Sequence, residues 1–489
     1  MTSSEPHLDS DVGLLSPVSA SPLVAVLTGD RAVLGAILAV EAAWATVLEK
    51  AGLAPAGSAA VVAAAADVGR YDAADIAVRA QGGGNPVLPL LADLREHVSE
   101  LDTGNIGAIR AVHTSLTSQD VLDSALMLLA RNAVTALLAD AHSTTTALAA
   151  LAEQHADTLC VGRSLTQHSL PLTFGLKAAQ WFHGLAAAAR NLEAMRLPVQ
   201  YGGAAGTLAA GTVLAGGTGS PLRLSPFDLS DRLAAQLGLA ATPAPWHTNR
   251  VAVTSLGDAL VAVTDALGKI ANDVLFLGRP EVSEVAEPRT AGRGVSSAMP
   301  QKQNPVLSVL VRSAALRAPG LAAQLHLAAA NFNDDRPDGA WHSEWQVLRE
   351  LLRLSLAAAG HVRELVDGLQ VFPAAMRRNV DLSGPLLLSE AVGGAVVPLL
   401  GDGGRKKLQD LVDQTLRAPT AEQGGTYRRL LRGVIAEDKL SNERLKELLD
   451  PANYLGQSHE ISRRILAAFP EFALPPVQDP GRRPDRSLP

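Results

Sequence analysis

The sequence predicts an all-α protein built around a long central bundle of helices. Hydrophobic residues make up 47% of the 489 residues but aromatic residues only 3%, so the apolar content is mainly alanine, leucine and valine. Alanine and leucine favour helices, and small side chains allow helices to pack closely. In addition, the middle of the chain holds long stretches in which apolar residues recur at helical spacing.

The helices are expected in the following order. A first helix is expected at residues 30–51, where apolar positions recur every three or four residues and Gly52 follows. Short helices and a glycine turn are expected up to about residue 112. Five long helices should follow, at 119–157, 173–195, 247–278, 305–330 and 342–370. Because a helix of about 25 residues is roughly 37 Å long, these five indicate an elongated bundle.

Composition changes along the chain, and these changes predict its domains. A small N-terminal helical domain (1–112) is expected before the central bundle (113–371). Beyond residue 371 the apolar segments shorten and carry more charge, which indicates a small C-terminal helical domain (372–470). The tail at 471–489 is rich in proline and charge and is expected to be disordered.

Charge and cysteine content argue against several classes of protein. A net charge of -7 gives no basic surface of the kind that binds nucleic acid. Cys160 is the single cysteine, so no disulfide is expected within the chain. The N-terminus is polar and acidic, unlike a secretory signal, and no apolar run is expected to reach the length of a membrane span. The expectation is a cytoplasmic protein that binds neither nucleic acid nor membrane and needs no metal or organic cofactor.

The segment with the most chemical information is 292–305, GRGVSSAMPQKQNP. Two serines lie among small residues, and Lys302 and Asn304 follow. Pro305 opens a predicted helix, and Asn304 suits the N-cap position before it. A lysine and the free backbone N–H groups of a helix N-terminus would then lie beside a serine-bearing loop, an arrangement that fits a carboxylate. An ordinary loop leading into a capped helix is the alternative.

Two further segments place polar groups before predicted helices. The segment from His113 to Asp123 (HTSLTSQDVLD) forms either a capping box between Thr117 and Asp120, a binding site, or both. The segment 162–181 (GRSLTQHSLPLTFGLKAAQW) forms either part of a site or a polar turn between helices.

Together these three segments resemble the signatures of the fumarase/aspartase superfamily, which read HxGxTSxD, GRTHxQxAxPxTFG and GSSxMPxKxNP in this order. Strings at 197–210, 245–250, 335–345 and 449–456 resemble the 3-carboxy-cis,cis-muconate cycloisomerase branch, so the resemblance covers about residues 20–470. It implies the three-domain helical fold of that superfamily. It also implies a homotetramer in which each active site is shared between subunits.

The resemblance also implies roles for individual residues. Ser296 would remove a proton from the carbon beside a carboxylate of a small dicarboxylate substrate, and Lys302 and Asn304 would stabilise the charge that develops there. The other substrate-binding positions would be Thr117, Ser118, Ser164 and Gln167, with Arg250, His247 and Arg336 as further candidates. We interpret His113, His168 and His342 as structural.

Departures from the family pattern bear on the leaving group. Leu165 stands where relatives that expel an amine or alkoxide carry a histidine, and leucine cannot protonate a leaving group. A group that leaves as a stable anion is therefore expected, either nitrite or the carboxylate of a lactone. Other departures are Val295, Ser115 and Val251, with Gln301 and Gln303 where cycloisomerases carry cationic residues.

A site with fewer cationic side chains is expected to bind a substrate with fewer negative charges. The two glutamines therefore favour a dicarboxylate that bears a neutral nitro group over a tricarboxylate. The predicted reaction is the conversion of nitrosuccinate to fumarate and nitrous acid. A 3-carboxy-cis,cis-muconate cycloisomerase is the first alternative, and a non-catalytic structural member of the fold is the second.

Overall fold

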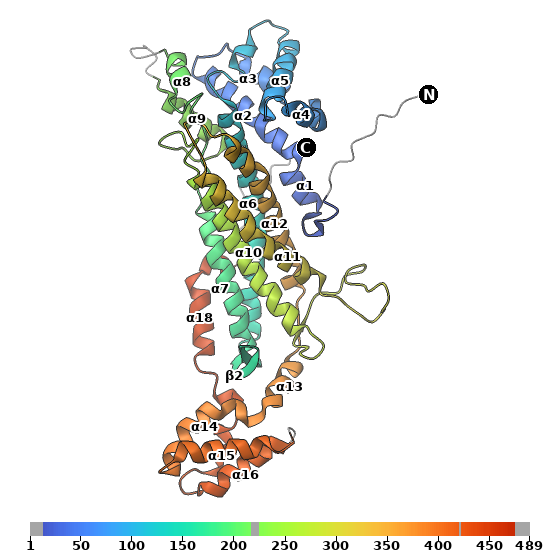
Figure 1. Ribbon diagram of the computed structural model, residues 1–489, viewed down its shortest axis with the longest axis vertical. Helices are drawn as coiled ribbons and strands as arrows, with labels where there is room; N and C mark the ends of the chain where they lie inside the picture. Colours follow the sequence, from blue (N-terminus) through green and yellow to red (C-terminus); the bar gives the residue numbers. More distant parts are fainter. Residues whose placement is uncertain (1–12, 217–223, 420–421, 475–489) are drawn as a thin grey trace. The chain divides into compact units, whose positions relative to one another are not determined.

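A computed structural model describes residues 13–216, 224–419 and 422–474 of the chain (Figure 1). The chain divides into two compact units. Unit 1 contains residues 1–140, 188–268 and 310–361, and unit 2 contains 141–187, 269–309 and 362–489. The predicted domain boundaries at residues 112 and 371 stay predictions, and most of the predicted disordered tail lies outside the described residues.

The first helices of unit 1 anchor the beginning of one candidate site segment. They are α1 (Pro22–Thr28), α2 (Asp30–Lys50), α3 (Ser58–Ala65), α4 (Ala73–Ala80) and α5 (Val87–Leu101). Helix α2 buries Leu38, Trp44 and Leu48 on one face, as its apolar spacing predicts. The Trp44 indole donates a hydrogen bond to the backbone carbonyl of Thr114 (2.8 Å). This bond ties α2 to the segment that precedes Thr117.

The five long helices confirm the predicted bundle elements. They are α6 (Ser118–Gln154), α7 (Phe174–Glu193), α10 (Val251–Leu277), α11 (Val306–Ala330) and α12 (Gly339–Asp367). Small residues allow α10 and α11 to approach closely within unit 1. A Cβ atom on Gly268 would lie 2.6 Å from the Cβ atom of Ala315, so only glycine fits there. Two shorter helices of unit 1, α8 (Ala209–Leu214) and α9 (Pro226–Leu237), precede α10.

A β-hairpin interrupts the helices in unit 2 and was not predicted. Strand β1 (Leu159–Ser164) pairs in antiparallel fashion with β2 (Gln167–Thr173), and Ser164 lies opposite Gln167 at the turn. The helix expected to reach residue 157 ends at Gln154 instead. A second small sheet joins β3 (Val285–Ala286) to β4 (Gln370–Val371). These strands are too short to change the all-α class.

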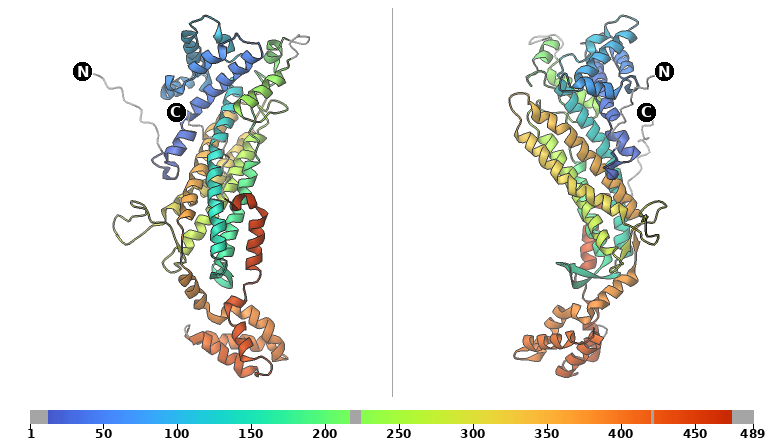
Figure 2. Two further views of the ribbon diagram at one scale, coloured as in Figure 1. Left: turned by 180° about the vertical axis from the view of Figure 1, so that it is seen from behind. Right: turned by 45° about the vertical axis from the view of Figure 1, so that its right-hand side comes forward.

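The C-terminal part of unit 2 has its own small core. It contains α13 (Pro373–Ser383), α14 (Ser389–Val396), α15 (Gly404–Leu416), α16 (Gln423–Val434) and α17 (Asn442–Leu448), followed by α18 (Ser458–Ala468) and α19 (Pro470–Ala473). Helices α14, α15 and α16 form a compact group, drawn in orange in Figures 1 and 2. Val392, Tyr427 and Leu431 are buried at its centre.

The expectation that no apolar run reaches the length of a membrane span was wrong. Among the described residues, five helical stretches are long and apolar enough to cross a membrane by length and composition alone. They include Ser118–Gln154, where 72% of the most apolar window is buried inside the protein. The reason is the alanine, leucine and valine content, which raises the hydropathy of bundle helices to the range of membrane spans.

Candidate active site

The loop that carries Ser296 belongs to unit 2 and holds its serine in a local turn. The Ser296 hydroxyl oxygen accepts hydrogen bonds from the backbone N–H groups of Met299 (3.2 Å) and Ala298 (3.4 Å). Lys302 is exposed on the same loop. At the base, the backbone N–H and the side-chain amide of Asn304 both donate to the carbonyl of Gly294, at 2.9 and 3.2 Å. Ser296 thus projects from a loop whose two ends are fastened together.

The N-terminus of α11 is occupied by a carboxylate of the protein itself. Glu287 accepts hydrogen bonds from the backbone N–H groups of Leu307 (3.1 Å) and Ser308 (2.7 Å). The prediction that Asn304 caps this helix and leaves free N–H groups for a substrate was therefore wrong. A helix N-terminus attracts the nearest carboxylate, and the carboxylate that reaches it comes from the start of the loop.

The hairpin between β1 and β2 presents two candidate residues at a strained, exposed tip. Ser164 and Gln167 flank Leu165 and Thr166, whose φ angles are +49° and +70°. These values are unusual for residues with a side chain, and more so for a β-branched threonine. The Leu165 side chain is 94% exposed in the single chain.

An ion pair holds this hairpin next to its tip. Arg163 contacts the buried carboxylate of Glu284 with both terminal nitrogens, at 2.6 and 3.2 Å. The Asn379 side chain donates to the same carboxylate (2.7 Å). His168 lies 2.7 Å from the Ser383 hydroxyl, and burial and then Arg163 lower the pKa of this histidine. The residues next to the exposed tip are therefore anchored to the rest of unit 2.

In unit 1, the segment from His113 to Asp123 bends sharply before α6. His113 and Ser115 have φ angles of +59° and +65°, and His113 is held by Glu41 (2.7 Å). The Asp120 carboxylate accepts from the backbone N–H of Thr117 (2.9 Å), which is half of the predicted capping box. The Thr117 hydroxyl instead accepts from Arg336 (2.8 Å). Two candidate substrate-binding residues, Thr117 and Arg336, are thus in direct contact.

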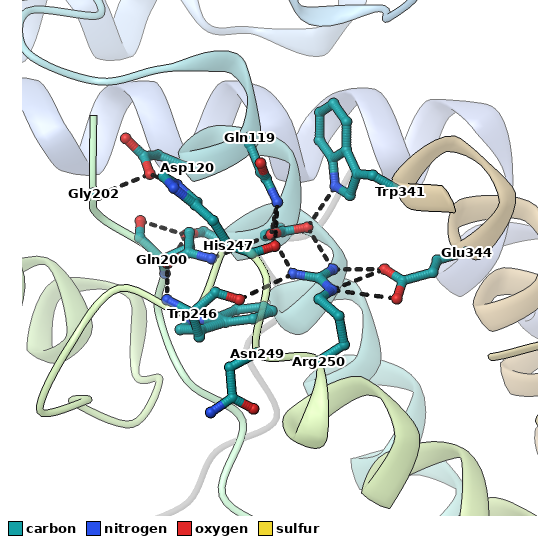
Figure 3. A network of polar contacts seen from close by, with 12 residues as sticks. Gln119, Asp120, Gln200, Gly202, Trp246, His247, Asn249, Arg250, Trp341 and Glu344 are labelled. Atoms are coloured by element: carbon teal, nitrogen blue, oxygen red, sulfur yellow. Dashed lines mark hydrogen bonds and ion pairs between the residues drawn. The ribbon is translucent and has the colours of Figure 1, made fainter. Parts of the chain in front are cut away.

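Two other candidates of unit 1, His247 and Arg250, lie inside a buried polar network (Figure 3). The Arg250 guanidinium contacts Asp123 at 2.7 and 3.0 Å and Glu344 at 2.7 and 3.0 Å. His247 donates from Nε2 to Asp120 (2.7 Å). Both candidate side chains are only 3% exposed, so their polar groups point into the protein.

The network contains two carboxylates around one cation, and this balance affects their ionisation. Burial raises the pKa of Glu344 to about 7, against the effect of Arg250, and Asp123 adds to the increase. Burial alone would lower the pKa of Arg250. Asp123 and Glu344 more than offset this effect, so the pKa of Arg250 lies above its ordinary value. The Trp341 indole donates to Asp123 as well (2.9 Å). Sequence reasoning missed Asp123, Glu344 and Trp341 because nothing in their local patterns indicates such contacts.

The predicted site residues thus fall into two groups. Unit 1 contains Thr117, Ser118, His247, Arg250 and Arg336. Unit 2 contains Ser164, Gln167, Ser296, Lys302 and Asn304. Within the described parts of the chain, no cluster of three or more histidine, cysteine, aspartate or glutamate side chains could hold a metal ion. The expectation that the reaction needs no metal stays a prediction.

Comparison with known proteins gives consistent results. A family model described as a lyase matches residues 19–320. A nitrosuccinate lyase of Streptomyces davaonensis is 40% identical over 472 residues, which are 95% of this chain and 96% of that protein. A 3-carboxy-cis,cis-muconate cycloisomerase of Pseudomonas aeruginosa is 38% identical over 456 residues, 92% of this chain and 94% of that protein.

Solved structures agree with the sequence comparison. The crystal structure of the 3-carboxy-cis,cis-muconate lactonizing enzyme from Pseudomonas putida has a TM-score of 0.82 and 34% identity, and covers 94% of this chain and 100% of that one. A fumarate lyase from a Mesorhizobium species has a TM-score of 0.77 and 30% identity, with 92% and 98% covered. The chain therefore belongs to this lyase family and is a lyase with the helical fold of the fumarase/aspartase superfamily.

Proposed function

We propose that this lyase converts nitrosuccinate to fumarate and nitrous acid. Ser296 takes the proton from the carbon beside one carboxylate, and the electron pair of the broken C–H bond forms the double bond. The C–N bond breaks and its electron pair leaves on nitrite. The observation that carries the proposal is the pair of backbone N–H groups, of Ala298 and Met299, that donate to the Ser296 oxygen.

A serine hydroxyl removes a proton only if its alkoxide form is stabilised. Fixed N–H donors stabilise an oxyanion without reorganising during the reaction, and each is worth more in a site from which water is excluded. The turn at Ser296 supplies two such donors before any substrate binds. A loop that closes over the substrate would shield them from water.

The substrate carboxylates need cations and hydroxyl groups as partners. We propose that Lys302 and Asn304 hold the carboxylate on which charge develops, since a partner of developing charge acts mainly on the transition state. Thr117, Ser118, Ser164 and Gln167 would bind the remaining substrate oxygens. Arg336 supports the binding role of Thr117, because it donates to the Thr117 hydroxyl and its Nε–H is buried without a partner among the described residues.

Leu165 supports a leaving group that departs as an anion. Nitrite and a carboxylate both qualify, because neither needs to be protonated as it leaves. The 40% identity to a nitrosuccinate lyase over nearly the whole chain favours nitrite. The glutamines give weaker support, because Gln303 donates to the backbone carbonyl of Arg293 (3.0 Å) and so helps to close the base of the loop.

A cycloisomerase that acts on 3-carboxy-cis,cis-muconate is the second candidate. The 38% identity to such an enzyme and the TM-score of 0.82 to a lactonizing enzyme favour it. The idea of a non-catalytic structural protein is not retained, because the chain is a lyase that keeps Ser296, Lys302 and Asn304.

We further propose that the protein is a homotetramer with shared active sites. Its support is the amount of apolar surface that the single chain leaves exposed. Leu316 and Leu327 of α11 are 73% and 67% exposed, and Leu165 is 94% exposed. Val309 of the same helix is 52% exposed, and three exposed apolar side chains along one long helix favour an interaction surface.

The function is tested by offering the purified protein nitrosuccinate and 3-carboxy-cis,cis-muconate in separate reactions. Fumarate and nitrite formed in equal amounts, and no lactone, are the expected result. Lactone formation without turnover of nitrosuccinate would show that the second candidate is correct. The Ser296→Ala variant in each reaction corrects for uncatalysed decay of the nitro compound.

A further inference from the structure

The Asp120 carboxylate collects four hydrogen-bond donors in unit 1. Its Oδ2 atom accepts from the backbone N–H groups of Thr117 and Gly203, both at 2.9 Å. Its Oδ1 atom accepts from the N–H of Gly202 (2.9 Å) and from Nε2 of His247 (2.7 Å), as Figure 3 shows for the Gly202 bond. Asp120 is fully buried. An ionised carboxylate only accepts hydrogen bonds, and all four of these groups can donate.

The four donors come from three separate stretches of chain. They are the turn before α6, the glycine turn at 202–203, and the loop that precedes α10. At the glycine turn, a Cβ atom on Gly202 would lie 2.7 Å from the His247 ring, and Gly203 has a φ angle of +72°, which strains a residue with a side chain. Asp120 therefore fixes the relative position of the three stretches to within the tolerance of a hydrogen bond.

Thr117 is held through both its backbone and its side chain. Its backbone N–H is bound by Asp120, and its hydroxyl is bound by Arg336 (2.8 Å). His247 is fixed too: in the neutral imidazole, donation from Nε2 leaves Nδ1 as the unprotonated nitrogen. That nitrogen is buried and has no partner within the described residues. Asp120 thus sets both the position of Thr117 and the tautomer of His247.

We propose that Asp120 is a positioning residue of the reaction, which acts by fixing Thr117 and Ser118 for contact with the substrate. This inference rests on the proposed binding role of those two residues. An asparagine is isosteric with Asp120 but cannot replace it. The NH2 group of asparagine would replace one carboxylate oxygen and would then face the two N–H groups that donate to that oxygen. Because donors facing donors cannot form hydrogen bonds, the turn before α6 or the glycine turn must move.

The test is a double-mutant cycle between Asp120→Asn and Thr117→Ala, measured as kcat/KM. A displacement of about 1 Å in a positioning group can cost about 100-fold, and we expect Asp120→Asn to lose about that much, mostly in kcat. In the Thr117→Ala background the same substitution should cost clearly less, because one of the two groups that Asp120 positions is already gone. Equal losses in both backgrounds would show that Asp120 has only a structural role and would overturn the proposal.

A matched control and a milder variant keep the test independent of folding. Asp102 also accepts three backbone N–H groups, those of Ile106, Gly107 and Ala108, but lies outside the candidate segments. Asp102→Asn should leave kcat/KM unchanged even if it lowers stability. Gly203→Ala leaves space for its Cβ, whose nearest neighbour is 3.6 Å away, and only strains the turn. It should lower kcat/KM about tenfold, and its effect should also shrink in the Thr117→Ala background.

The result separates this inference from the proposed function. If the wild-type protein acts on 3-carboxy-cis,cis-muconate and not on nitrosuccinate, the proposed substrate is wrong. The same cycle measured on lactone formation then still decides the role of Asp120. If nitrosuccinate is the substrate and the two substitutions are additive, the proposed function stands and the positioning role is rejected.

Discussion

The two groups of candidate residues are built in opposite ways. In unit 1 the polar side chains around Asp120, Asp123 and Arg250 are buried, and most of their hydrogen-bonding groups have partners. In unit 2, Lys302 and the hairpin tip at Leu165 are exposed, and the serine loop is held mainly at its base. The difference separates a preformed scaffold from elements that need another surface or a substrate to complete them. Substitutions at Arg250 and its two carboxylate partners in unit 1 should thus affect mainly stability, and those in the serine loop of unit 2 should affect mainly turnover.

The largest effect on turnover is expected for Ser296→Ala. Turnover should be abolished, because no other group takes the proton, whereas the melting temperature should stay within about 2 °C since the side chain makes only two long hydrogen bonds. Steady-state kinetics and calorimetry measure both. Ser297→Ala, on the exposed neighbour, is the control and should retain activity. More than a few per cent of wild-type rate in Ser296→Ala would refute its role as the base.

The largest effect on stability is expected for Arg250→Ala. Removal of the cation leaves the buried carboxylates of Asp123 and Glu344 without their partner, which typically costs about 3–5 kcal/mol. Urea unfolding of the variant and of wild type measures the loss. Arg349→Ala, which removes a partly exposed ion pair to Asp30, should cost far less. If Arg250→Ala folds with normal stability but no longer binds substrate, the scaffold interpretation of unit 1 is wrong.

Lys302→Ala should lower kcat as well as raise KM. A cation that stabilises charge developing in the transition state lowers the activation free energy by about 3 kcal/mol, and this is lost in the variant. Lys302 is exposed, so stability should not change. Rate measurements over a range of substrate concentrations separate the two constants. A raised KM with an unchanged kcat would mean that Lys302 only anchors the substrate.

The network of unit 1 should also make stability depend on pH. Burial raises the pKa of Glu344 from 4.5 to about 7, so the folded protein holds a proton that the unfolded chain releases. This contribution to the free energy of unfolding is complete below pH 4.5 and is lost as pH rises to about 7, by up to about 3 kcal/mol. Urea unfolding between pH 4.5 and 8 should reveal this slope in wild type and a flatter one in Glu344→Gln. An identical slope in both proteins would assign it to another group.

The smallest effect is expected for Leu165→His at the hairpin tip. If nitrite leaves as an anion, an added acid gives no gain with nitrosuccinate, and an exposed substitution changes stability by about 0.5 kcal/mol at most. In wild type, kcat should rise with pH and then level off. A bell-shaped profile that loses its alkaline limb in His168→Ala would mean that a histidine protonates the leaving group.

The long helices could be predicted from the sequence because their apolar spacing is local. The polar network could not, because Asp123 and Glu344 meet Arg250 from positions about a hundred residues away in each direction. The same holds for Glu287, whose contact with the start of α11 displaces the N-cap role expected of Asn304. The hairpin was missed because Leu165 and Thr166 adopt a turn that usually requires glycine or asparagine. Motifs therefore identified the candidate residues, whereas only the structure identified their partners.

The fastening at the base of the serine loop determines how much of the chain must become ordered when substrate binds. Asn304 is joined to Gly294, and Glu287 holds the first turn of α11, so residues 295–303 lie between these fastenings. Fixing the backbone of one residue costs about 1–2 kcal/mol in conformational entropy. A loop closed at its neck has already lost part of this freedom, so less of the binding free energy of a small dicarboxylate is consumed in closing it.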